Sequence, residues 1–170
     1  AELLEGKGRI AMLMHVPGSV STMDRESRFQ AVLAREYSGI RIVAHQFGMA
    51  DRAKAQAVAE NFLTAHPDLD AIFASGEAST FGASLAVKAR RMAGRVKLVG
   101  FDASSELVAD LESGVINALV IQDPFRIGYE SVRTLVDRLN GKTPPKRIDL
   151  NARVITRTDL ANPDVKAMLN

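Results

Sequence analysis

The stretch Val96-Lys97-Leu98-Val99-Gly100-Phe101-Asp102 decides the fold of this chain. Its apolar and β-branched residues form a short run, which is typical of a strand buried inside a parallel sheet. The run ends in Gly-Phe-Asp, and Ala103-Ser104-Ser105-Glu106 then opens a helix. Ligands of open α/β sheets bind just outside the carboxyl ends of the strands. We therefore expect Asp102 to stand in a small-molecule site rather than in the core.

Four other apolar runs resemble this one, and helix-like patterns separate them all. The predicted strands cover residues 8–14, 40–44, 69–74, 96–101 and 115–121. Strands that alternate with helices of one to two dozen residues predict βαβ units with right-handed crossovers. The expected fold is an α/β domain, with a doubly wound parallel sheet of about five strands and helices on both faces.

Local signals predict where three of the helices begin. Ser21 followed by Asp24 predicts a capping box, and Asp51 predicts the cap of the next helix. Asp123 followed by Pro124 predicts a third start, because proline is favoured at the first helical position. The linker-like turn at 141–146 follows that third helix.

The composition excludes several classes of protein. Apolar residues make up 46% and charged residues 25% of the 170 residues, which excludes a wholly disordered chain. The formal net charge is only +2, and this argues against a nucleic-acid surface. The chain has no cysteine, so disulfides give no information on the compartment. No apolar run reaches membrane-spanning length and the N-terminus lacks a signal-peptide pattern, so we expect any export signal to have been removed already.

Polar and small residues follow every predicted strand, and a parallel sheet places all of them on one rim. Together they supply a cation, a carboxylate and an amide, but few candidate general bases. Planar Arg, Asp and Gln groups match sugar hydroxyls, which both donate and accept hydrogen bonds. The rim therefore predicts a site for a neutral polyhydroxylated ligand. Its residues are His15, Val16, the loop 18–25, Phe47-Gly48-Met49-Ala50, Ser75-Gly76-Glu77, Asp102 and Gln122.

Several of these residues also have a purely structural explanation. Asp102 can cap the helix that follows it, although nearby serines can do the same, and we favour the functional explanation. Arg25 taken alone is better explained as a solvated helix charge. Gln122 is equally well explained by satisfying the backbone of its loop. Ser75-Gly76-Glu77 is most simply a helix entrance with an acid that the helix dipole favours.

The motifs of other chemistries are missing from the sequence. The three histidines, His15, His45 and His66, lack the spacing of metal ligands. No Gly-x-Ser-x-Gly, P-loop or Gly-x-Gly-x-x-Gly motif occurs. We therefore expect no metal and no cofactor, and an enzyme is disfavoured because no nucleophile–base set is present.

The chain resembles the periplasmic sugar-binding proteins of bacterial ABC importers, of the ribose-binding type. Besides Arg25, the resemblance is carried by the run 63–74, by Gly100-Phe101-Asp102 and by Gln122-Asp123-Pro124, and it covers nearly all of the chain. The resemblance implies two similar lobes that clamp a sugar between them. Residues 1–122 and 148–170 then correspond to the second lobe, and residues 123–147 to a segment that returns to a first lobe missing from this chain.

The resemblance also implies roles for single residues. Arg25 and Asp102 match the arginine and aspartate that bind sugar hydroxyls, Gln122 matches the hinge glutamine, and Val16 matches an apolar ligand contact. Two positions depart from the pattern. Gly76 lies where ribose binders commonly have asparagine, and Ala50 lies where they have an aromatic residue that stacks on the sugar ring. The pentose specificity of the family is therefore not carried over, and Glu77 or Phe47 is a candidate replacement.

Two functional hypotheses follow. The first is a non-catalytic, periplasmic solute-binding protein that closes on a sugar or related polyol and delivers it to a membrane permease. The second is the effector-binding domain of a lactose-repressor-type transcription regulator, which shares the fold. The tail Val154-Ile155-Thr156-Arg157-Thr158-Asp159-Leu160 resembles the ending of the transporter family more closely, so the regulator ranks second. If the first lobe is missing, the helix 125–139 exposes an apolar face, which predicts self-association of the chain or exchange of this helix between copies.

Overall fold

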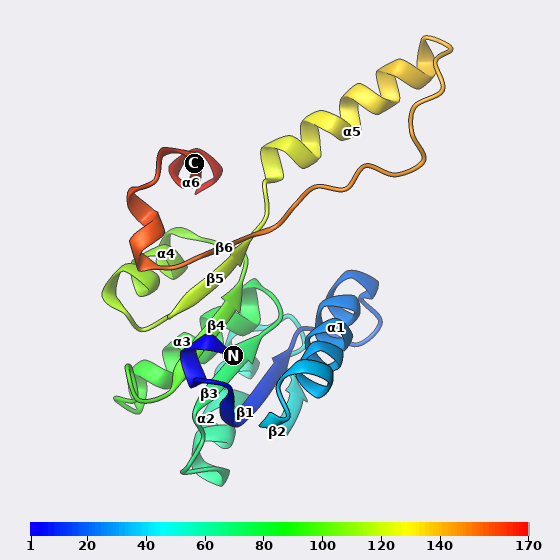
Figure 1. Ribbon diagram of the computed structural model, residues 1–170. Helices are drawn as coiled ribbons and strands as arrows, with labels where there is room; N and C mark the ends of the chain where they lie inside the picture. Colours follow the sequence, from blue (N-terminus) through cyan, green and yellow to red (C-terminus); the bar gives the residue numbers. More distant parts are fainter. Residues whose placement is uncertain (170) are drawn as a thin grey trace.

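A six-stranded sheet forms the centre of the molecule in the computed structural model, which describes residues 1–169 (Figure 1). The strand order is β2-β1-β3-β4-β5-β6; the first five strands of the chain are parallel and β6 is antiparallel to β5. The predicted α/β parallel sheet is confirmed, with a sixth strand added at one edge. The strands are β1 Lys7–Met14, β2 Gly39–Phe47, β3 Ala71–Ala74, β4 Lys97–Phe101, β5 Ala118–Ile121 and β6 Arg153–Ile155.

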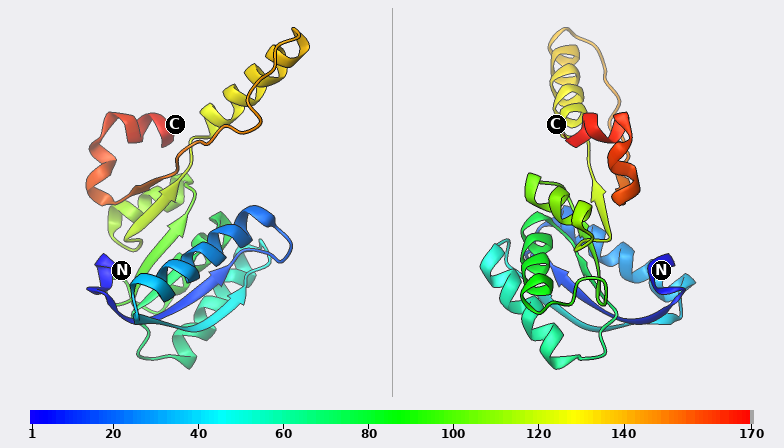
Figure 2. Two further views of the ribbon diagram at one scale, coloured as in Figure 1. Left: turned by 45° about the vertical axis from the view of Figure 1, so that its right-hand side comes forward. Right: turned by 90° about the vertical axis from the view of Figure 1, so that its left-hand side faces the viewer.

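Helices cover both faces of the sheet, as expected (Figure 2). Helix α1 packs on one face through Phe29 and Leu33, next to Ile10 and Ile40 of the first two strands. Helices α2, α3 and α4 pack on the other face, where they form the larger core. The helices are α1 Val20–Glu36, α2 Arg52–Ala65, α3 Glu77–Ala89, α4 Ser105–Ser113, α5 Pro124–Leu139 and α6 Pro163–Leu169, with 3₁₀ turns η1 Glu2–Leu4 and η2 Arg157–Ala161.

Two of the three predicted helix starts are confirmed. The Asp51 side chain accepts the backbone N–H of Lys54, and the Asp123 side chain accepts that of Arg126. The capping box predicted at Ser21 is wrong, because α1 begins at Val20 with Ser19 as the residue before it. Each cap fixes the direction in which a helix leaves the carboxyl end of a strand.

The chain after β5 differs from the rest of the molecule. Helix α5 and the segment 140–152 extend away from the sheet, and the chain then returns to add β6 beside β5 (Figure 1). No residue of α5 is buried, whereas Ile155 of β6 and Val165 of α6 lie in the main core. The apolar residues on α5 are therefore open to solvent, as the sequence predicts. None of the helices in residues 1–169 is long and apolar enough to cross a membrane.

Candidate functional site

Arg25, Asp102 and Gln122 meet at the carboxyl end of the sheet, although they lie far apart in the sequence. Gln122 Nε2 donates a hydrogen bond to Asp102 Oδ1 across 2.7 Å. Arg25 Nη1 lies 3.9 Å from the other carboxylate oxygen, Asp102 Oδ2. Because β4 and β5 are parallel neighbours, the residues that follow them reach the same edge. We call these three side chains the polar row.

The Arg25 guanidinium is held on two sides. It lies over the Phe101 ring, with 3.8 Å between the central carbon and the ring centroid, and Nη1 donates to the Ser75 carbonyl oxygen across 3.1 Å. Only 20% of the side chain is exposed. The explanation of Arg25 as a solvated helix charge is therefore wrong, since aromatic stacking and a backbone acceptor fix the group in place.

Asp102 is positioned by its backbone. Its φ of 67° lies in the left-handed region, which Asp and Asn adopt more readily than most residues. Its N–H donates to the Val120 carbonyl oxygen across 2.8 Å. Ser104, not Asp102, caps α4 by accepting the N–H of Leu107. The carboxylate is consequently not used as a cap, and at 32% exposed it remains accessible.

A buried carboxylate supports the polar row from inside the fold. Glu26 is 4% exposed, and its Oε1 accepts hydrogen bonds from the Ser75 hydroxyl at 2.6 Å and from the His15 backbone N–H at 3.1 Å. These contacts join α1 to the ends of β1 and β3. Because Arg25 precedes Glu26 in α1, the same contacts fix the helical turn that carries the guanidinium.

Three other predicted site residues lie around His15 on the same rim. Val16 follows it and is partly buried, while the exposed Ala50 donates its N–H to the His15 carbonyl oxygen across 3.0 Å. Gly76 is the residue before α3, and a Cβ added there would lie 2.8 Å from His15 Nδ1. None of the three adds a polar side chain to the row.

Glu77 and Phe47, the suggested replacements, are engaged elsewhere. Glu77 forms an ion pair with Arg52, whose guanidinium lies 4.0 Å from the centroid of the Phe81 ring. Phe47 packs against the core cluster that contains Met12. Neither contact joins these residues to the polar row, so the structure gives no support to either replacement.

The charge of Arg52 also acts on a second acid. The pKa of Glu106 lies below its ordinary value, chiefly because its own backbone N–H hydrogen-bonds the carboxylate, with further contributions from the hydroxyls of Ser105 and Ser104. The positive charge of Arg52 lowers that pKa further. Arg52 thus pairs with Glu77 and acts on Glu106 only through its charge.

Sequence reasoning missed two residues of this site. Phe101 supplies the ring beneath Arg25, and Glu26 supplies the buried acceptor. Each stands next to a predicted site residue, which is the signal that was available. Within residues 1–169, no group of three His, Asp or Glu side chains is arranged to hold a metal ion.

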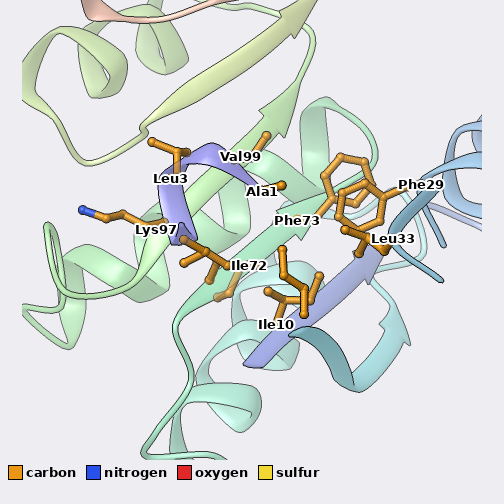
Figure 3. Close-up of a pocket in the computed structure, with 12 residues that line it drawn as sticks. Ala1, Leu3, Ile10, Phe29, Leu33, Ile72, Phe73, Lys97 and Val99 are labelled. Carbon is orange, nitrogen blue, oxygen red and sulfur yellow. The ribbon is translucent and has the colours of Figure 1, made fainter. Parts of the chain in front are cut away.

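A separate hollow lies on the α1 face of the sheet, away from the polar row (Figure 3). Its lining includes Ile10, Phe29 and Phe73, together with residues at the amino ends of β3 and β4. Lys97 is the single charged side chain in this lining, as far as the described residues go. An apolar hollow of this kind offers no set of partners for hydroxyl groups, so we do not place a sugar there.

Comparisons with known proteins point to one family. A family model described as "Periplasmic binding protein domain" matches residues 1–143. The ribose import binding protein of Bacillus subtilis is 31% identical over 154 residues, which are 89% of this chain and 48% of that protein. The ribose import binding protein of Escherichia coli is 30% identical over 156 residues, 89% of this chain and 51% of that protein.

Solved structures show the same fold. An ABC transporter solute-binding protein from Agrobacterium vitis, bound with α-D-tagatopyranose, aligns with a TM-score of 0.94 at 29% identity, over 99% of this chain and 56% of that one. A carbohydrate transporter solute-binding protein from Agrobacterium radiobacter, in complex with D-arabinose, aligns with a TM-score of 0.93 at 26% identity, over 96% of this chain and 56% of that one. The chain spans about half the length of the curated relatives it matches, and it belongs to the periplasmic binding protein family.

Proposed function

We propose that this chain is one lobe of a periplasmic solute-binding protein that binds a sugar or related polyol and delivers it to an ABC permease. The observation that carries the proposal is the polar row. Asp102 accepts from Gln122 and faces Arg25, so one carboxylate, one amide and one guanidinium converge on an open edge. Such groups pair with adjacent hydroxyls of a sugar, each of which donates and accepts.

The affinity of the complete protein for carbohydrates tests this function. Calorimetry against a panel of monosaccharides and polyols is expected to find saturable binding of at least one member. Gln122→Ala is expected to weaken that binding by roughly tenfold, about the effect of one hydrogen bond. Asp149→Ala, an exposed change in the tail, serves as the control and is expected to leave the affinity unchanged. A panel in which nothing binds would contradict the proposal.

The division of the chain into lobes is part of this proposal. Residues 1–122 and 148–170 form the second lobe, and residues 123–147 return to a first lobe that the chain does not contain. The projection of α5 and the return of β6 to the sheet support this division (Figure 1). Closure of the two lobes on the ligand is then a hinge motion, driven by contacts that the ligand makes with both.

The exposed side of α5 gives a prediction for the chain on its own. Its apolar stripe recurs at helical spacing and comprises Phe125, Tyr129, Val132, Leu135, Val136 and Leu139, each of them exposed. Because an uncovered patch of this kind drives association, the isolated 170-residue chain is expected to self-associate. Leu135→Glu is expected to shift it toward monomer in light scattering over a concentration series. Ser131→Glu lies outside the stripe and is the matched control; a wild-type chain that stays monomeric throughout would refute the expectation.

A further inference from the structure

The hydrogen bonds within the fold do not explain why a histidine stands at position 15. His15 directly follows β1, at the carboxyl end of the sheet where the polar row lies. Among the side-chain nitrogens of residues 1–169, His15 Nδ1 is the one that is buried without a hydrogen-bond partner. The residue as a whole is only partly buried. With Nδ1 unpaired, the hydrogen bonds within residues 1–169 do not explain why an imidazole stands at this position.

The backbone of His15 is fixed on both sides. Its N–H donates to the buried carboxylate of Glu26 across 3.1 Å. Its carbonyl oxygen accepts the N–H of Ala50 across 3.0 Å, which ties it to the loop between β2 and α2. Contacts with α1 and with this loop therefore fix the backbone from which the imidazole projects. A fixed backbone suits a side chain that binds a ligand without reorganisation.

The ring is also held against Gly76. A Cβ at that position would lie 2.8 Å from Nδ1 and 3.2 Å from Cγ of His15, so only glycine leaves room for the imidazole. The residue before Gly76 is Ser75, whose carbonyl oxygen accepts the hydrogen bond from Arg25. His15 thus lies against Gly76 and Arg25 against Ser75, which are adjacent residues after β3, and this brings the imidazole near the polar row.

The buried nitrogen also bears on where the proton lies. Neutral imidazole carries one N–H, and the other nitrogen is an acceptor. Orphaned buried N–H groups are rarer in proteins than under-satisfied acceptors, so we assign the proton of the neutral ring to Nε2. Nε2 is then a hydrogen-bond donor.

We infer that His15 is a specificity-determining contact of the proposed sugar site, with Nε2–H donating to one oxygen of the ligand. The inference rests on the proposed function and adds a hydrogen-bond donor to the proposed sugar site. Asp102 accepts and Arg25 donates at one part of the ligand, whereas His15 selects ligands that present an acceptor oxygen toward the carboxyl ends of β1 and β3. A monodeoxy sugar that lacks that oxygen is discriminated against by this residue.

His15→Phe tests the assignment in the complete protein, because it keeps a ring against Gly76 and removes both nitrogens. Calorimetry with the best-bound sugar of the panel and its monodeoxy analogues is expected to show binding weakened roughly tenfold. The preference for the parent sugar over one of those analogues should fall by a similar factor. His45→Phe, on the exposed part of β2, is the matched control and is expected to change neither quantity.

An NMR titration of the unaltered protein keeps the test decisive if the variant folds poorly. Addition of the same sugar is expected to shift the Nε2 resonance of His15 and to leave that of His45 in place. Sugar binding with no shift at His15, or with unchanged affinity and unchanged discrimination in His15→Phe, would overturn the assignment and leave the proposed function standing. Failure of the unaltered protein to bind any carbohydrate would overturn both.

Discussion

Replacing Asp102 with alanine is expected to weaken carbohydrate binding by the complete protein at least about a hundredfold. The carboxylate is the shared partner of Arg25 and Gln122. Its loss therefore removes its own hydrogen bonds to the ligand, leaves Gln122 Nε2 without its acceptor and leaves Arg25 without its carboxylate partner. A hydrogen bond to a charged group contributes about 1.5–3 kcal/mol, and two of them account for a hundredfold or more. Calorimetry with the sugar that the unaltered protein binds best measures the effect.

The control for this change follows from the backbone at position 102. The φ of 67° is strained for alanine, whereas asparagine tolerates the left-handed region nearly as well as aspartate. Asp102→Asn is therefore expected to keep the thermal stability of the protein and to lose affinity, whereas Asp102→Ala loses about 1 kcal/mol of stability as well. Full affinity in Asp102→Asn and Asp102→Ala alike would remove the carboxylate from the site.

The parts of the fold that could be predicted are those that local pattern decides. Buried strands that are followed by polar residues, as β4 is followed by Asp102, indicate both the sheet and its ligand-binding edge. The start of α5 was equally predictable, because an aspartate cap followed by proline specifies a helix by itself. These signals depend on neighbouring residues in the sequence, so contacts between distant segments did not alter the strands and helices that they predict.

The parts that could not be predicted depend on contacts between distant segments. In the sequence alone Arg25 looks like a surface charge. Its position depends on Phe101, at the end of β4, and on the carbonyl oxygen of Ser75, which follows β3. The edge strand β6 has only three residues, and its pairing with β5 follows from the burial of Ile155 rather than from any run of apolar residues. The role of Gly76 likewise depends on which side chain faces it.

The stretch that decides the fold also yields the largest expected effect on stability. Gly100→Ala is expected to destabilise the protein by about 3 kcal/mol or more, as overpacking of a filled core does. A Cβ at this position would lie 2.1 Å from Thr80 Cγ2 and 2.7 Å from Thr80 Oγ1. The Thr80 side chain is fully buried, its hydroxyl accepts the N–H of Phe101 at 2.9 Å, and it donates to the Gly76 carbonyl oxygen at 2.8 Å. It cannot turn away without breaking both bonds.

Urea denaturation of Gly100→Ala measures the loss, and a second substitution tests its cause. Thr80→Ser keeps the hydroxyl and removes Cγ2, the atom that the new methyl group would meet first. If steric overlap is the reason, Gly100→Ala combined with Thr80→Ser recovers part of the stability that Gly100→Ala loses, although Thr80→Ser alone gains nothing. A midpoint for Gly100→Ala close to that of the unaltered protein would show that β4 and α3 separate at little cost. Such separation would displace Phe101, and Arg25 would then lose the ring that holds it beside Asp102.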